Sequence, residues 1–171
     1  MAKTLVVAYN ISTYEARYYS TVFYEFSDKY DVPWEIYPAL IRIESNFKPG
    51  LRSSKGAKGL MQILEGTGRD VARKIGVNFI PEETLWNETL NLVIGMTYLT
   101  DAIKRDTTES DSSALAHGIK TYLGGPDYVK ALKEASGENA KYIGVYKSTV
   151  WDEYTKLRYI YKGVQFQGIK Q

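Results

Sequence analysis

The side chains of this chain that could do chemistry are carboxylates, because the sequence has no cysteine and one histidine, His117. The lack of cysteine excludes disulfides, thiolate metal sites and thiol nucleophiles. A single histidine excludes a histidine metal cluster and any Ser-His-Asp relay that does not use His117. We expect His117 to be a helix residue with no catalytic part. Catalysis is therefore expected to depend on carboxylates, with no metal and no cofactor.

Glu44 is the candidate proton donor. It lies about 65° from the centre of an apolar stripe at helical spacing, and the stripe consists of Ile36, Leu40, Ile43 and Phe47. A carboxyl on this shoulder is partly removed from water, which raises its pKa and lets it stay protonated and donate a proton near neutral pH. From the residues alone, a solvated Glu44 that pairs with Arg42 or Lys48 is the commoner arrangement.

The elements that must position Glu44 are predicted to be helices, because the periodicity is helical and no convincing alternating strand is present. Helices are expected at residues 14–29, 67–74, 89–105, from 112 or 113 to 123, 127–134 and 138–157. A further helix follows Asp31 and either kinks at Pro38 or begins there. Residues 48–60 are expected to form a glycine-rich loop. The length of 171 residues predicts one domain.

Five ordered blocks of sequence carry a family resemblance. They are Glu44-Ser45-Asn46-Phe47; Ser53-x-x-Gly56-Ala57 with Gly59-Leu60-Met61-Gln62-Ile63; Asn91-Leu92-Val93-Ile94-Gly95-Met96-Thr97-Tyr98-Leu99; Tyr122-Leu123-Gly124-Gly125-Pro126; and Tyr142-Ile143. In order and spacing they resemble the soluble lytic transglycosylase (SLT) domain, which is related to goose-type lysozyme. Leu123 stands where that family usually has Asn.

The resemblance implies an all-α, predominantly helical fold of the α+β lysozyme-like superfamily, with a groove between helices. The whole chain, residues 1–171, would form a single compact domain. Its motif-bearing core would span about residues 30–146. Helix 14–29 and the C-terminal helix and tail at 147–171 would be additions to that core.

The resemblance also implies an activity, the cleavage of the β-1,4 bond between N-acetylmuramic acid and N-acetylglucosamine in peptidoglycan. Glu44 would protonate the leaving oxygen while the substrate's N-acetyl group stabilises the oxocarbenium-like centre. The Glu44 carboxylate would then take the proton of the C6 hydroxyl, which closes a 1,6-anhydro ring. Substrate contacts are implied for Ser53, Met61, Gln62, Tyr98, Tyr122 and Tyr142.

Two alternatives to a lytic transglycosylase remain open at this stage. A hydrolytic muramidase on the same fold would use water in place of the C6 hydroxyl, and its products would be heavier by one water. A wall-docking structural module would keep the fold without turnover. Glu44 argues against the module, because a pure binder gains nothing from a partly buried carboxyl.

Composition restricts the expected partners and place of action. The net charge of +2 comes from 22 basic and 20 acidic residues that are interspersed, which gives no indication of nucleic-acid binding. The longest apolar run, Leu5 to Ala8, is far shorter than the roughly 20 residues of a membrane span, and no signal peptide is recognised. The expected partner is the peptidoglycan glycan strand at the cell wall or periplasm. Delivery would use a phage lysis system, a phage virion or a secretion machine, of which the phage route is favoured.

Overall fold

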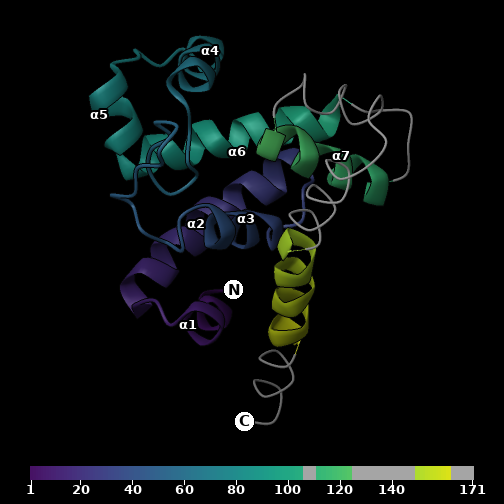
Figure 1. Cartoon of the computed structure of the whole chain (residues 1–171). Coiled ribbons are helices and arrows are strands. Elements are labelled where there is room, and N and C mark those ends of the chain that lie inside the picture. The colour runs from purple at the N-terminus through teal and green to yellow at the C-terminus, as the bar shows by residue number, and fades with distance from the viewer. Residues whose placement is uncertain (106–110, 125–148, 163–171) are drawn as a thin grey trace. The chain divides into compact units, whose positions relative to one another are not determined.

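The structure, a computed structural model, describes residues 1–105, 111–124 and 149–162. Within these ranges the chain consists of helices joined by loops, and its extended pairing is limited to two isolated β-bridges (Figure 1). The predicted all-α, predominantly helical fold is confirmed. The expected helix 127–134 and the first part of the expected helix 138–157 lie outside the described residues, whereas residues 149–157 are helical.

The chain divides into two compact units, and each is described by itself. The first unit consists of Met1–Ile43 and Thr149–Gln171, and the second of Glu44–Ser148. The first unit contains α1 (Ala2–Tyr9), α2 (Thr13–Tyr30), α3 (Ile36–Glu44) up to its last residue, and helix 149–162.

Helix α2 begins at a capping box, which is why its position was readable from sequence. The Ser12 hydroxyl accepts a hydrogen bond from the Glu15 N–H at 3.2 Å, and the Glu15 carboxylate accepts one from the Ser12 N–H at 2.9 Å. Tyr19 and Phe23 are buried on its core face, where their rings stack with centroids 6.0 Å apart. Helix α1, which packs against α2, was not predicted, because eight residues are too few for local signals to establish a helix.

Helix α3 carries Glu44 as its last residue. It begins at Ile36, two residues before Pro38, so Pro38 lies in the first turn, where its missing N–H has no helical acceptor. The expected start at Pro38 is therefore wrong by two residues. The helix stops before Phe47, because Asn46 and Phe47 both adopt left-handed backbone angles with φ of 52° and 59°.

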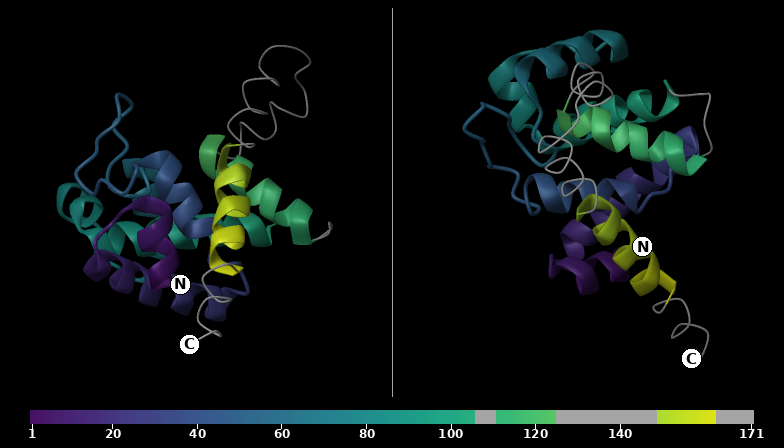
Figure 2. Two further views of the ribbon diagram at one scale, coloured as in Figure 1. Left: turned by 90° about the horizontal axis from the view of Figure 1, so that it is seen from below. Right: turned by 45° about the vertical axis from the view of Figure 1, so that its right-hand side comes forward.

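The second unit is built around one central helix. Its described helices are α4 (Glu65–Ile75), α5 (Pro81–Trp86), α6 (Glu88–Lys104) and α7 (Asp111–Gly124). Helix α6 contacts the other three, and α6 and α7 lie side by side (Figure 2). The Asn87 side chain caps α6 by accepting a hydrogen bond from the Leu90 N–H at 3.0 Å. The helices predicted at 67–74, 89–105 and up to 123 are confirmed with small shifts of their ends, while the six-residue α5 was missed.

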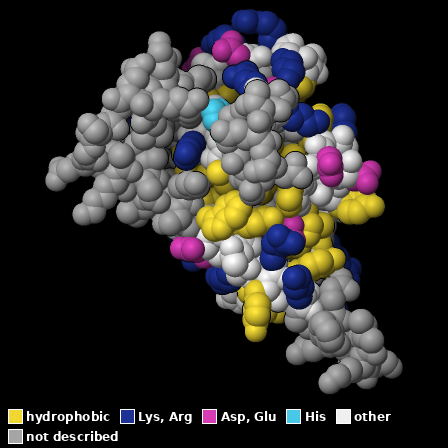
Figure 3. Space-filling view, turned by 90° about the vertical axis from the view of Figure 1, so that its right-hand side faces the viewer, with side chains coloured by type: hydrophobic (Ala, Val, Ile, Leu, Met, Phe, Trp, Pro, Cys, Tyr) yellow, Lys and Arg dark blue, Asp and Glu magenta, His cyan; other side chains and the backbone are white. Residues whose placement is uncertain are grey.

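The surface agrees with the interspersed charge of the sequence. On the face shown in Figure 3, the described Lys and Arg side chains are mixed with Asp and Glu side chains. None of the described helices is both long enough and apolar enough to cross a membrane.

Candidate active site

Glu44, at the C-terminal end of α3, has the properties of a proton donor. Its side chain is partly buried, and this burial raises the pKa of the carboxyl to about 7. The C-terminal end of a helix further disfavours a negative charge. Among the described residues no cation forms an ion pair with Glu44. The alternative of a solvated Glu44 paired with Arg42 or Lys48 is therefore not the arrangement that the structure shows.

Two tyrosines predicted for the site come together beside this acid. The rings of Tyr98 on α6 and Tyr122 on α7 have centroids 5.4 Å apart at an angle of 52°. Burial raises the pKa of Tyr122 well above its usual value, and the charge of Glu44 raises it further. Tyr122 therefore stays neutral and lies close enough to Glu44 to respond to its ionisation.

The Tyr122 hydroxyl holds the loop that follows α3. It donates a hydrogen bond to the carbonyl oxygen of Met61 at 2.6 Å. The Tyr98 hydroxyl makes a much longer contact, 3.5 Å, to the carbonyl of Thr121 within α7. Of the two hydroxyls, the Tyr122 hydroxyl therefore makes the stronger link between α7 and the loop.

Met61 itself lies in the core, which corrects the expectation that its side chain lies on the groove wall. The side chain is 0% exposed and packs against Gly95 of α6, where an added Cβ would overlap the Met61 side chain. The backbone of Met61, and not its thioether, therefore contacts the site. Gly95 lets the loop approach the central helix this closely.

The predicted contacts Ser53 and Gln62 are used within the loop. The Ser53 hydroxyl oxygen accepts a hydrogen bond from the Ala57 N–H at 3.0 Å. Gln62, with a left-handed φ of 48°, donates from its amide nitrogen to the carbonyls of Leu51 at 3.0 Å and Gly59 at 2.8 Å. Both N–H groups of the Gln62 amide are therefore occupied, and its carbonyl oxygen is the atom left to meet a sugar.

Asn91 holds the same loop from the central helix, a role that was not predicted from the sequence. The side chain is buried; it accepts from the Met61 N–H at 2.9 Å and donates to the carbonyls of Lys58 at 2.9 Å and Leu85 at 3.0 Å. A side chain at Gly59, which has φ of 79°, would overlap Asn91. The available signal was an asparagine near the start of a helix whose other buried residues are apolar or threonine.

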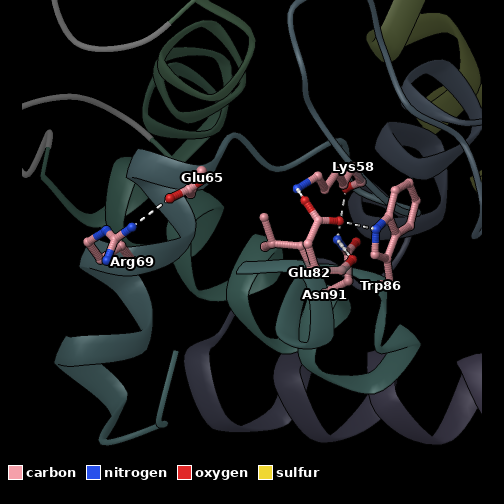
Figure 4. Close-up of polar contacts among 7 residues, drawn as sticks. Lys58, Glu65, Arg69, Glu82, Trp86 and Asn91 are labelled. Carbon is pink, nitrogen blue, oxygen red and sulfur yellow. Dashed lines mark hydrogen bonds and ion pairs between the residues drawn. The ribbon is translucent and has the colours of Figure 1, made fainter. Parts of the chain in front are cut away.

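A buried lysine fixes the far side of the loop (Figure 4). Lys58 is 3% exposed and its ammonium group pairs with the Glu82 carboxylate at 2.5 Å. The other carboxylate oxygen of Glu82 accepts a hydrogen bond from the Trp86 indole at 2.8 Å. These bonds hold the pKa of Glu82 below its usual range. The pair joins the loop to α5, because a buried ammonium group needs a partner.

The remaining candidates lie elsewhere. Tyr142 lies outside the described residues. Glu65 is on the surface, where it pairs with Arg69 at 2.6 Å (Figure 4). In the described part of the chain, no group of three or more His, Cys, Asp or Glu side chains could hold a metal ion. The structure thus brings Glu44, Tyr98 and Tyr122 together with the backbone of Met61.

Comparison of the sequence with protein families and curated proteins identifies relatives. The transglycosylase SLT domain family matches residues 21–143. The endo-type membrane-bound lytic murein transglycosylase A of Citrobacter koseri is 39% identical over 123 residues, which cover 67% of this chain and 54% of that protein. The protein of the same name from Klebsiella pneumoniae is 39% identical over 79 residues, 43% of this chain and 39% of that protein. The chain spans about half the length of these relatives or less.

Solved structures share the fold. The 70 kDa soluble lytic transglycosylase from Escherichia coli has a TM-score of 0.69 at 23% identity, over 82% of this chain and 24% of that chain. An inactive mutant of the lytic transglycosylase Slt from Pseudomonas aeruginosa has a TM-score of 0.58 at 19% identity, over 82% of this chain and 22% of that chain. Because the family match covers well over half of its residues, the chain belongs to the transglycosylase SLT domain family.

Proposed function

We propose that this domain is a lytic transglycosylase that cleaves the β-1,4 bond between N-acetylmuramic acid and N-acetylglucosamine and forms a 1,6-anhydromuramoyl product. One observation carries the proposal: Glu44 lies beside Tyr122 in a domain of the SLT family, and burial raises the pKa of the Glu44 carboxyl to about 7. The curated relatives are named lytic murein transglycosylases. A structural neighbour that is an inactive mutant carries a glutamate-to-glutamine change.

A pKa of about 7 suits both roles of one carboxyl. Near neutral pH about half of the Glu44 side chains are protonated and can donate to the leaving glycosidic oxygen. The carboxylate that results is basic enough to take the proton of the C6 hydroxyl as that oxygen attacks C1. The attack is intramolecular, so the nucleophile is already in place. With the N-acetyl group stabilising the positive centre, this route needs no second carboxylate.

The proposed substrate contacts follow from the positions of the side chains. Tyr98 and Tyr122 form a tyrosine pair beside the acid, and the Gln62 carbonyl oxygen can accept a hydrogen bond from an N-acetyl N–H or a sugar hydroxyl. Ser53 and Tyr142 remain proposed contacts. We propose the bacterial cell wall as the place of action, reached through a phage lysis system, a virion or a secretion machine.

The test is mass analysis of the products that the full chain releases from purified peptidoglycan. Products with 1,6-anhydro ends are expected, each lighter by one water than the product of hydrolysis. Products with the mass expected for hydrolysis would show that the protein is a muramidase. Binding to peptidoglycan without release of fragments would assign a wall-docking module, for which Glu44→Gln and the natural chain would behave alike.

A further inference from the structure

A run of basic residues separates Glu44 from the next acidic residue, Glu65. It contains Lys48, Arg52, Lys55 and Lys58. We call residues 48–58 the basic loop. Lys58 is buried and paired with Glu82, whereas the other three are exposed. In the described part of the chain neither Lys48 nor Lys55 forms an ion pair.

Hydrogen bonds give the basic loop a fixed shape. The carbonyl of Lys48 accepts from the Leu51 N–H at 3.3 Å, and Arg52 and Lys58 face each other in an antiparallel bridge. Beyond the bridge, Ser53 N–H donates to the Ala57 carbonyl at 2.9 Å, which closes a turn around Lys55. The exposed cations are thus presented on a backbone that needs little further ordering when a ligand binds.

The base of the basic loop adjoins the candidate active site. The carbonyl of Leu51 accepts from the Gly59 N–H at 3.0 Å and from the Gln62 amide at 3.0 Å. Gln62 directly follows Met61, whose carbonyl accepts from Tyr122. Hydrogen bonds therefore join the base of the basic loop to the segment that Tyr122 contacts.

These cations do not set the pKa of Glu44. A nearby cation lowers the pKa of a carboxyl, whereas the pKa of Glu44 is raised, with burial as the cause. Arg52 acts on a different carboxyl, since it helps to lower the pKa of the exposed Glu82. Lys48 and Lys55 form no ion pair in the described part of the chain, so their charges are available to a ligand, while the exposed Arg52 also acts on Glu82.

We propose that the basic loop binds the carboxylates of the peptide stems of peptidoglycan and so favours peptide-bearing strands over bare polysaccharide. The proposal rests on the proposed function, because it takes peptidoglycan as the substrate. The sugar hydroxyls and N-acetyl groups are neutral, while the stems branch from the muramic acid beside the cleaved bond and carry carboxylates. Lysine and arginine form charge-assisted hydrogen bonds with carboxylates.

The test measures binding of the full chain to sedimented peptidoglycan, with Glu44→Gln in every variant to stop turnover. The test variant changes Lys48, Arg52 and Lys55 to Gln. The control changes Lys3, Arg17 and Lys29, which are also exposed but belong to the first unit, to Gln. Three surface contacts predict about tenfold weaker binding for the test variant at low ionic strength. The control should stay within about twofold.

Two treatments of the peptidoglycan identify the bound group. Coupling the carboxylates to ethanolamine with a carbodiimide makes them neutral. This should weaken binding of the protein that carries only Glu44→Gln about tenfold, while binding of the test variant stays unchanged. Hydrofluoric acid removes phosphate-linked wall polymers and should change nothing. Sensitivity to the acid treatment alone, or equal loss in test and control variants, would overturn the proposal.

The two proposals fail separately, because this assay measures binding and not cleavage. The natural chain could release anhydro products while the Glu44→Gln protein binds ethanolamine-coupled and untreated peptidoglycan equally. The role of the basic loop would then be wrong, and the enzymatic proposal would stand. If no fragments were released, selective binding through the basic loop would still be measurable.

Discussion

The Tyr122 hydroxyl donates a hydrogen bond to the carbonyl of Met61 at 2.6 Å, across 61 residues of sequence. The N–H of Met61 donates to the Asn91 side chain at 2.9 Å. Both backbone polar groups of Met61 are thus bonded to side chains, one from α6 and one from α7. The loop is held against the pair of helices that also carries Tyr98, and Tyr122 is placed beside Glu44.

Tyr122→Phe should destabilise the protein, because it leaves the Met61 carbonyl without its donor in a buried position. The expected loss is about 1 to 3 kcal/mol in the free energy of unfolding, measured by urea denaturation. Tyr98→Phe is the matched control, since the Tyr98 hydroxyl makes a contact of 3.5 Å, and it should cost less than half as much. Equal losses in the two variants would contradict the role given to Tyr122.

Asn91→Ala should be more damaging, because three hydrogen bonds are lost and three backbone groups are left without this partner. We expect a loss of about 2 to 4 kcal/mol in the free energy of unfolding. Asn87→Ala is the control on the same helix; it removes only an exposed cap and should cost about 1 kcal/mol. If Asn91→Ala cost no more than Asn87→Ala, the loop would be held by other contacts.

Local signals in the sequence account for the helices that were predicted correctly. Ser12 and Glu15 form a capping box, Asn87 caps α6, and Gly76 ends α4 with a left-handed φ of 73°. Each of these signals acts within one helical turn, so a sequence pattern can record it. Helix α5 begins with Pro81 and two acidic residues, but six residues are too few for these signals to establish a helix without its packing against α4 and α6.

The candidate site was predicted less completely, because its geometry depends on contacts distant in sequence. The position of Glu44 on the edge of an apolar stripe was enough to predict a raised pKa. Whether Met61 points into the groove or the core depends on the left-handed backbone at Gln62 and on the close approach of Gly95. Asn91 bonds to Met61, which lies 30 residues earlier in the sequence.

Glu44→Gln should lower the rate of peptidoglycan cleavage by at least about 10²-fold while leaving binding nearly unchanged. The amide has the shape of the acid but cannot transfer a proton. Release of soluble fragments and sedimentation binding measure the two effects separately. Glu65→Gln is the control, because Glu65 is a surface residue paired with Arg69, and it should keep its activity. A Glu44→Gln rate within tenfold of the natural protein would remove Glu44 as the acid.

Glu44 should also make the stability of the protein fall as the pH rises from about 4.5 to about 7. Its pKa is raised from 4.5 in the unfolded chain to about 7 in the fold, so the folded state binds more protons between these values. The stabilising contribution is complete below the unfolded pKa and is lost as the pH rises through the folded pKa. It amounts to at most about 3 kcal/mol. Glu44→Gln removes the titration, so it should gain stability relative to the natural protein as the pH rises, and the difference should level off above pH of about 7. Urea denaturation at a series of pH values measures the two curves, and a constant difference between them would show that Glu44 does not titrate with a raised pKa in the folded protein.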